Sequence, residues 1–345
     1  MTKQSFLHSS MLSSEHPSWE YLLSSDKSPT KNLLAFSGGI DSTALFFLLI
    51  EKNIDFDLAI VNHNTRKESH KESEYAHTLA KKYNKKIFTK ELHFDTLANF
   101  EAKARELRYA FFDKIISENK YTTLLTGHQL NDKLEWFFMQ LSKGAGLSEL
   151  VGMEEISQRE TGEYKYQIIR PLLAESKQSL KAYLDKNEHL YFVDASNADV
   201  RHKRNYFRQK YCEEFLAEFE GGVRNSFAYL QADKKHLPSL QVYQQYKEYF
   251  VYHNYELDTM RLVDKIFKKR KILLSLSQKK EILRTSQGVI GGFSLELDAQ
   301  YIHIAPALKV TIPKRAKEQY RIQKIPPKIR PYLFDEGLLL NKENK

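Results

Sequence analysis

The stretch NLLAFSGGIDSTALFFLLI, residues 32–50, constrains the fold of this chain more than any other. It predicts an apolar strand, a short polar hinge over residues 37–42, and an apolar helix, an order typical of α/β domains. Adjacent glycines permit positive φ and a close approach to the backbone, and the first N–H groups of a helix converge on one point. The hinge therefore predicts an anion cradle, although a plain strand-to-helix turn would also use Gly38 and Gly39.

The residues after the hinge alternate apolar strands with amphipathic helices. The predicted strands are 33–36, 56–61, 87–92 and 122–126, and the predicted helices are 42–51, 68–83 and 99–119. Strands separated by helices of this length require right-handed crossovers, so the predicted fold class is α/β with a doubly wound parallel sheet. Such a sheet binds its ligand at the carboxyl ends of its strands.

Changes in composition predict three parts. Residues 1–30 are rich in serine and read as a leader, with a short helix near Trp19–Leu23. Residues 31–212 hold the alternating pattern and form the first predicted domain. Residues 213–345 form a second, smaller and mostly helical domain that is rich in tyrosine and lysine.

Two local patterns in this second domain predict particular elements. Residues 240–250 read as a helix. Ser294–Leu297 and Tyr301–Ile304 alternate apolar and polar residues after two glycines, which predicts a small hairpin.

The charge balance favours a polyanionic partner, because 53 Lys and Arg oppose 44 Asp and Glu, a formal net charge of +9. Two basic runs, Arg261–Arg284 and Lys309–Arg330, lie in the last third of the chain. Each alone could be a solvated helix face. Together they favour contact with nucleic acid.

Cysteine content and hydropathy predict a cytoplasmic protein without a membrane segment. The single cysteine, Cys212, can form neither an internal disulfide nor a multi-thiolate metal site. The longest apolar runs, such as Ala44–Ile50, are far shorter than the roughly 20 residues that span a bilayer.

Asp41 is unexpected in a pure anion cradle. A carboxylate beside phosphates can hold a magnesium ion, which prefers oxygen ligands. It can also simply place a favourable charge in the first turn of a helix. The lysine of the Walker-type phosphate loop is missing, which disfavours an ordinary kinase or GTPase.

The hinge SGGIDS (37–42), placed after a buried strand, resembles the PP-loop of the ATP pyrophosphatase superfamily. Four further segments resemble motifs of one family in it, the tRNA(Ile)-lysidine synthases, over roughly residues 32–210. They are EAKARELRYAFF (101–112), TGHQLNDKLEWFFMQLSKGAGLSELVGM (126–153), IIRPLL (168–173) and VDASNADVRHKRNYFR (193–208). Five motifs in the right order are much more specific than any one of them.

The resemblance implies an ATP-dependent ligation on tRNA(Ile) with a CAU anticodon. ATP would adenylate the C2 oxygen of the wobble cytidine and release pyrophosphate, and the amine of free L-lysine would then displace AMP to form lysidine. ATP and Mg²⁺ are the implied cofactors. The oligomeric state is left open, a homodimer included.

The resemblance also implies roles for individual residues. The PP-loop residues that would bind ATP are Ser37, Gly38, Gly39, Ile40, Asp41 and Ser42, with Asp41 as the magnesium ligand. The implied catalytic residues are Asp41, Arg105, Asp132 and Glu135. The residues implied to contact the tRNA are Arg108, Arg204, Asn205 and Arg208.

Simpler structural interpretations exist for several of these residues. Asp132 and Glu135 lie where a loop enters a helix and could form a capping box with Asp132 as the N-cap. Glu101 and Arg105, spaced i and i+4, could form a helix-surface salt bridge. The basic stretch from residue 201 to 210 could be a plain contact with the RNA backbone, and His128 would only line the pocket.

The chain also departs from the family pattern. Residues 60–66 read IVNHNTR where the family usually has HVDHGLR, which affects the expected adenine pocket. Gln129 and Trp136 replace a histidine and a threonine. Two rival functions stay open: another PP-loop tRNA-modifying enzyme, such as a thiolase, and a non-catalytic RNA-binding protein.

Overall fold

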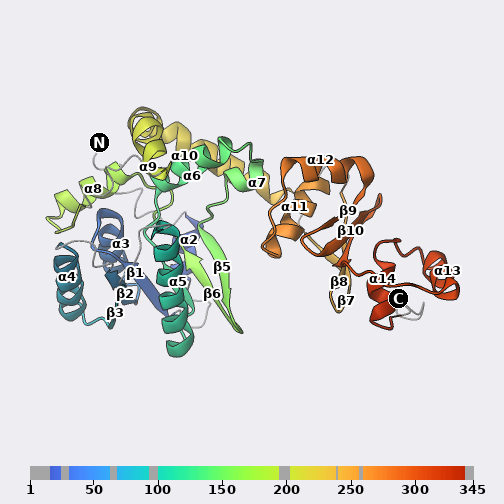
Figure 1. Ribbon diagram of the computed structural model, residues 1–345. Coiled ribbons are helices and arrows are strands. Elements are labelled where there is room, and N and C mark those ends of the chain that lie inside the picture. Colours follow the sequence, from blue (N-terminus) through green and yellow to red (C-terminus); the bar gives the residue numbers. More distant parts are fainter. Residues whose placement is uncertain are drawn as a thin grey trace. The chain divides into compact units, whose positions relative to one another are not determined.

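The computed structural model describes residues 16–24, 31–62, 68–92, 100–193, 203–237, 240–255 and 259–338. The chain divides into two compact units, Met1–Lys235 and His236–Lys345 (Figure 1). The division between these units lies after Lys235, farther along the chain than the domain boundary predicted near residue 213. The physical reason is that the helix beginning at Glu213 packs against the first unit through Leu216, Val223 and Phe227.

The first unit alternates strands and helices as predicted. Its elements in chain order are α2 (Pro17–Leu23), β1 (Asn32–Phe36), α3 (Ile40–Glu51), β2 (Asp57–Asn62), α4 (Glu68–Lys82), β3 (Ile87–Glu91), α5 (Phe100–Asn119), β4 (Thr123–Leu125), α6 (Leu130–Leu141), α7 (Leu147–Leu150), β5 (Ile156–Thr161), β6 (Tyr164–Ile169), α8 (Lys177–Lys186), α9 (Lys203–Phe207), the π-helical turn η2 (Arg208–Cys212) and α10 (Glu213–Lys235).

The strands form one six-stranded sheet in the order β3-β2-β1-β4-β6-β5. All neighbours are parallel except β5, which pairs antiparallel with β6. The predicted doubly wound parallel sheet is therefore confirmed. The chain moves outward from β1 to β3 and then returns to the other side of β1, so the switch point lies between β1 and β4, where such folds bind ligands.

Both faces of the sheet are covered because neighbouring residues of a strand point to opposite faces. Leu34 packs with α3, α4 and α8 in one core cluster, and Leu33 packs with α5 in another. In the first cluster, the ring of Phe46 lies 5.2 Å from those of Phe47 and Phe56. Edge-to-face ring pairs of this kind each stabilise the fold by about 1 kcal/mol beyond the contribution of burying their apolar surface.

A further layer lies beyond the carboxyl ends of the central strands, where α6, α9 and α10 gather (Figure 1). Leu130 and Leu134 of α6 pack with Cys212 of η2 and with α10 in a separate core cluster. The backbone N–H of Leu130 donates a 2.8 Å hydrogen bond to the carbonyl oxygen of Glu175. The start of α6 is thereby held at the carboxyl end of β4.

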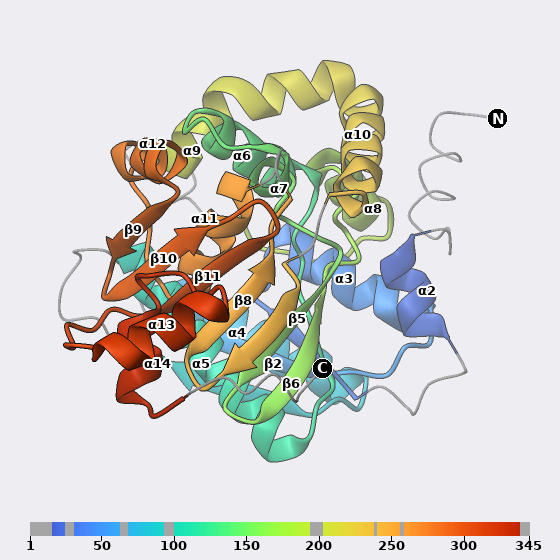
Figure 2. The same ribbon diagram turned by 90° about the vertical axis from the view of Figure 1, so that its right-hand side faces the viewer.

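The second unit is built on a five-stranded antiparallel sheet in the order β7-β8-β11-β10-β9. Its elements are β7 (Val242–Tyr246), β8 (Tyr249–His253), α11 (Thr259–Lys269), α12 (Leu276–Thr285), β9 (Gln287–Ile290), β10 (Phe293–Leu297), β11 (Tyr301–Pro306), α13 (Lys314–Ile322) and α14 (Arg330–Asp335). One core cluster joins the sheet to α11 and α12, and another joins it to α13 and α14 (Figure 2).

Two expectations for this unit have different outcomes. The hairpin over residues 294–304 is confirmed, with Leu295 opposite Ile304. The helix over residues 240–250 is wrong, because these residues form β7 and the start of β8. Pairing of β8 with β11 in the middle of the sheet outweighs the local preference of this polar segment for a helix. The unit is therefore mixed rather than mostly helical.

Candidate active site

The polar hinge forms the loop between β1 and α3. Gly38 has a φ of +76°, in the left-handed region that favours glycine. A Cβ on Gly38 would lie 3.3 Å from Cδ2 of Phe192. The carbonyl oxygen of Gly38 accepts a 2.9 Å hydrogen bond from the N–H of Phe192. The loop needs glycine here both for its turn and for this close approach.

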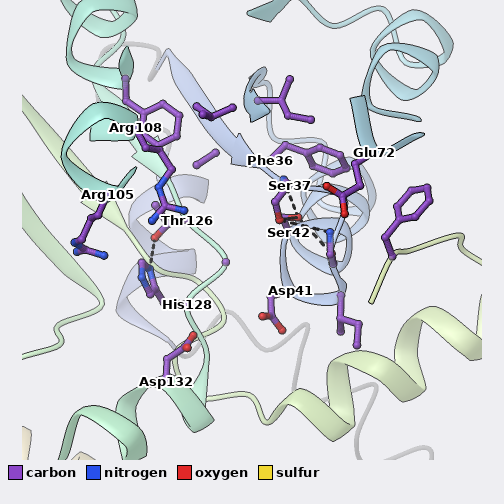
Figure 3. Close-up of a pocket in the computed structure, with 18 of the residues that line it drawn as sticks. Phe36, Ser37, Asp41, Ser42, Glu72, Arg105, Arg108, Thr126, His128 and Asp132 are labelled. Atoms are coloured by element: carbon purple, nitrogen blue, oxygen red, sulfur yellow. Dashed lines mark hydrogen bonds between the residues drawn. The ribbon is translucent and has the colours of Figure 1, made fainter. Parts of the chain in front are cut away.

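Ser42, in the first turn of α3, stabilises the loop through its hydroxyl group. Its Oγ accepts a 3.1 Å hydrogen bond from the N–H of Ser37 and lies 3.1 Å from the Oγ of Ser37 (Figure 3). Gly39 is the N-cap of α3 and makes no side-chain cap bond. No cap side chain therefore competes for the first amide groups of α3, and such a helix start attracts phosphate.

Asp41 follows in the same turn, and its side chain is half-buried with one carboxylate oxygen enclosed. Its Oδ1 has no hydrogen-bond partner among the described residues. Burial raises the pKa of its carboxyl group to about 7, and the neighbouring carboxylate of Asp132 adds to the rise. An unpaired, desolvated carboxylate oxygen is costly unless a cation or a donor reaches it.

The donors around Asp41 suit a magnesium ion that is shared with phosphates. Among the described residues, no three His, Cys, Asp or Glu side chains group into a metal site of their own. Magnesium is commonly bound through one or two carboxylates together with substrate phosphates. Asp41 beside the loop therefore fits this kind of site.

Asp132 and Glu135 lie in the first two turns of α6. Its N-cap is Gln129, whose Oε1 accepts a 2.5 Å hydrogen bond from the N–H of Asn131. Oδ2 of Asp132 accepts a 3.0 Å hydrogen bond from the N–H of Gln129, which completes a capping box. The expectation that Asp132 is the N-cap is wrong, because the chain stays extended through Gln129.

Both carboxylates face two arginines of α9 and η2. Oδ1 of Asp132 accepts a hydrogen bond from Nη2 of Arg204. Oε2 of Glu135 accepts a 2.6 Å bond from Nε of Arg204, and its Oε1 accepts a 2.6 Å bond from Nε of Arg208. Glu135 is only 1% exposed, and Asn205 of the same motif is also buried. These pairs join two motifs that are far apart in the sequence.

His128, just after β4, lies among further arginines. Its Nδ1 is 2.9 Å from Oγ1 of Thr126 (Figure 3). Burial lowers the pKa of His128 to about 3, and four positive charges lower it further: those of Arg170, Arg204, Arg105 and Arg108. The imidazole is neutral at physiological pH. The guanidinium groups of these four arginines create a strongly positive surface around one neutral side chain, which favours a bound anion. We call these four residues the arginine wall.

Arg105 also belongs to a contact that the sequence did not indicate. Its guanidinium carbon lies 4.9 Å from the ring centroid of Tyr109, and that of Arg159 lies 4.7 Å from the same centroid. Arg159 is held by Asp113 through bonds of 2.9 and 2.6 Å. Oδ1 of Asp113 also accepts a 2.6 Å bond from Tyr166. In the sequence, nothing marks Arg159 except its position in the segment that forms β5.

A cleft of about 490 Å³ lies at the carboxyl ends of β1 and β4. The predicted site residues that line it are Ser37, Gly39, Ile40, Asp41, Ser42, Arg105, Arg108, Asp132, Arg204 and Arg208. Gly38, Glu135 and Asn205 do not line it. Gly38 shapes the loop, and Glu135 holds the two arginines from behind.

Two further lining residues were not singled out from the sequence. Lys177 lies in the first turn of α8, where its N–H donates a 3.0 Å bond to Oδ1 of Asn131. Its charge lowers the pKa of Asp41 and so opposes the effect of burial. Glu72 of α4 lies beside Ser37 of the loop (Figure 3). For Lys177 the available signal was its place one residue after the Ser176 N-cap.

Several expected positions lie outside the described residues. They are residues 63–66 of the altered segment, the Asp-x-Ser-Asn motif at 194–197, and the side chain of Glu101. Residues 60, 61 and 62 of the altered segment are described and line the cleft. None of the described helices is long and apolar enough to cross a membrane.

Comparison with known proteins identifies the family of the chain. The family model of the PP-loop domain matches residues 15–215. A tRNA(Ile)-lysidine synthase from Campylobacter jejuni (strain RM1221) is 40% identical over 310 residues, which cover 89% of this chain and 94% of the relative. One from Helicobacter pylori (strain 26695) is also 40% identical, over 89% of this chain and 90% of its own length.

Among solved structures, the tRNA thiolase NcsA from Methanococcus maripaludis, which holds a 4Fe-4S cluster, has a TM-score of 0.50. It is 15% identical and covers 68% of this chain and 82% of its own, so the likeness concerns the fold alone. The PP-loop match and the long alignments at 40% identity identify the chain's family directly. This chain belongs to the tRNA(Ile)-lysidine synthase family of PP-loop proteins.

Proposed function

We propose that this chain uses ATP to ligate free lysine to C2 of the wobble cytidine of tRNA(Ile) with a CAU anticodon, forming lysidine, AMP and pyrophosphate. Curated relatives with the name tRNA(Ile)-lysidine synthase align over most of the chain, which supports the reaction class. The observation that carries the proposal is the unpartnered Oδ1 of Asp41 beside a glycine loop at the sheet's switch point. That combination suits a nucleoside triphosphate with its cation.

In the first step, the loop would hold the β- and γ-phosphates of ATP. The amide groups at the start of α3 and the hydroxyl groups of Ser37 and Ser42 are donors for phosphate oxygens. Asp41 would hold a magnesium ion against the same phosphates. When bound, magnesium draws charge from phosphate oxygens and so makes pyrophosphate a better leaving group.

The α-phosphate would then lie toward the arginine wall. Burial lowers the pKa of Arg108, and the charges of Arg105 and Arg204 lower it further. An anion in this place relieves the repulsion among these groups. Arg105 and Arg108 are therefore the groups we expect to stabilise charge on the α-phosphate as the C2 oxygen of cytidine attacks it.

In the second step, the deprotonated ε-amine of lysine attacks C2 and the C2–O bond breaks, so AMP leaves with the oxygen while the new C2–N group releases a proton to solvent. Asp132, which lines the cleft, would attract the ammonium group of lysine, and Glu135 behind it would add negative charge. Arg204 and Arg208 already occupy their oxygens, so we expect the two arginines to shift when lysine and tRNA bind. The chain's contribution to both steps is mainly alignment and charge stabilisation.

The second unit would hold the rest of the tRNA. Some of its basic residues are committed to ion pairs, since Lys268 and Lys279 both pair with Asp264 at 2.7 and 2.9 Å. Others, such as Lys269 of α11 and Lys317 of α13, are exposed. These are suited to phosphate contacts that weaken with salt. With tRNA, ATP and free lysine as substrates, we place the reaction in the cytoplasm.

The test is incubation with labelled lysine, ATP, magnesium and tRNA(Ile) transcripts that differ only at the wobble base. Label should enter the CAU transcript alone, and Asp41→Ala should abolish its entry. Equal labelling of both transcripts, or none, contradicts the proposal. Pyrophosphate release that depends on tRNA separates an enzyme from a non-catalytic RNA-binding protein.

The thiolase alternative is disfavoured by the chemistry of the thiol group. The chain has one cysteine, and Cys212 is buried among α6 and α10. Burial raises the pKa of its thiol to about 12. Thiolate chemistry needs a lowered thiol pKa, and an iron–sulfur cluster needs several cysteines.

A further inference from the structure

Two tyrosines stand exposed on the same helical segment that carries the cleft arginines. Tyr206 of α9 is 39% exposed and Tyr211 of η2 is 40% exposed. Their ring centroids lie 5.9 Å apart with the planes at 75°. We call these two residues the tyrosine pair. Large exposed rings in contact with each other are a feature of binding surfaces.

The π-helical turn is what brings the tyrosine pair together. In η2 the N–H of Glu213 bonds to the carbonyl oxygen of Arg208, five residues earlier. This wider turn allows residues five apart, such as Tyr206 and Tyr211, to stand on one side of the helix. π-helical turns are rare and occur frequently at functional sites.

The surroundings of the pair are basic. Nζ of Lys210 donates a 3.0 Å hydrogen bond to the hydroxyl of Tyr206 and lies 5.2 and 5.7 Å from the two ring centroids. Nζ of Lys203 lies 5.9 Å from the ring centroid of Phe207. No acidic residue occurs from 203 to 212. Aromatic rings interleaved with cations are typical of surfaces that bind single-stranded nucleic acid.

The pair lies on the short helical segment that borders the cleft. Arg204 and Arg208 line the cleft, and Tyr206 and Lys210, each two residues farther along, lie on another side of the same helix. A polynucleotide whose base enters the cleft therefore passes this segment with its neighbouring nucleotides. An enzyme that acts on a base must take that base out of its stack, which leaves the adjacent bases without a stacking partner.

We propose that Tyr206 and Tyr211 stack with unpaired bases of the tRNA anticodon loop next to the wobble base. This inference rests on the proposed function and adds the surface that receives the loop. The same helix continues into α10 with Phe215 and Phe219, but there Glu213, Glu214 and Glu218 accompany the rings. Acidic neighbours repel phosphates, so the RNA surface ends near Tyr211.

The experiment uses the full-length chain and two RNA hairpins, one with the CAU anticodon loop and one with that loop replaced by base pairs and a short unrelated cap. Affinities for both are measured by fluorescence anisotropy for the wild type and for Tyr206→Ala/Tyr211→Ala. Stacking of one base on one ring changes affinity about fivefold or more. The double variant should lose at least that factor for the anticodon-loop hairpin and little for the paired one.

Matched variants separate stacking from loss of structure. Tyr206→Phe/Tyr211→Phe keeps the rings and should bind like the wild type. Tyr229→Ala removes a tyrosine that is 72% exposed farther along α10 and should also bind normally. Circular dichroism and thermal melting of each variant show whether the helix is retained.

Equal affinity of the wild type and the double alanine variant for the anticodon-loop hairpin overturns the inference. So does a variant that weakens association between copies of the chain in sedimentation analysis but leaves RNA affinity unchanged, because the pair is then a protein interface. A wild type that binds neither hairpin refutes the tRNA part of the proposed function together with this surface. If the wild type and the double alanine variant both bind the anticodon-loop hairpin equally, only the inference about the tyrosine pair is refuted.

Discussion

Asp41→Asn should make the ligand-free protein more stable at neutral pH while it abolishes activity. Asp41 has its pKa raised from 3.8 to about 7 by burial and by Asp132. Between about pH 3.8 and pH 7, the native state therefore keeps a proton on Asp41 that the unfolded chain has already released. By linkage, the free energy of unfolding falls as the pH rises through this window and levels off above it. Asparagine does not ionise, so the variant avoids this loss.

The size of the effect follows from the pKa change. About three pKa units at 1.36 kcal/mol each give on the order of 4 kcal/mol above pH 7, and close to zero near pH 4. The difference at low pH measures any steric cost of the amide itself. For a domain of this size, 1 kcal/mol shifts the melting temperature by about 2–4 °C.

The assay is thermal melting of the ligand-free wild type and Asp41→Asn over the range from about pH 4 to pH 8. We expect the melting temperature of the variant to exceed that of the wild type by a margin that grows with pH. Magnesium and ATP together should then stabilise only the wild type. Parallel curves for the two proteins across this range would refute the reasoning, because Asp41 would then titrate normally.

Three further predictions concern charged residues in and outside the cleft. Glu135→Gln leaves Arg208 without a buried counter-charge and Arg204 with Asp132 alone, so it should lower the free energy of unfolding by about 3 kcal/mol in denaturant melts and abolish lysine incorporation. Arg159→Met removes one of the two cations over the ring of Tyr109, so kcat should fall about tenfold with little change in KM for lysine, and Arg159→Lys should recover part of the loss. The affinity for tRNA should fall at least about tenfold between roughly 50 and 200 mM salt in filter-binding assays, and an unchanged affinity would exclude phosphate contacts as its main source.

The first unit follows closely from its sequence because local and long-range preferences agree there. The strand before Ser37 is apolar on both faces, and the helix after it is too, so both are suited to the middle of a doubly wound sheet. The motif order then predicts which segments reach the switch point. The cleft brings Asp41, Asp132 and Arg204 together as that order implies.

Other features depend on contacts that a sequence does not display. The hairpin of β7 and β8 turns at Lys247 and Glu248, and Lys247 has a φ of +50°. No glycine, asparagine or proline marks this turn, so the segment reads as a helix. Gln129 is not a preferred N-cap residue, which hides the true start of α6.

The pairing of the cleft charges also lies beyond sequence reasoning. Spacing indicates that Asp132 and Glu135 share a region, but not that Arg204 and Arg208 fill their oxygens. The contact of Arg159 with Tyr109 depends on β5, an antiparallel edge strand that joins the sheet next to α5. Such partners come from distant segments that only the folded chain brings together.

The most direct test of the account is the transfer of label from ATP to tRNA in the absence of lysine. If the loop and Asp41 hold the departing pyrophosphate while the arginine wall receives the α-phosphate, label from the α-phosphate should appear on the CAU transcript, label from the γ-phosphate should not, and added lysine should release the first as AMP. Transfer of γ-label, or no transfer of α-label while lysidine still forms, would contradict the account.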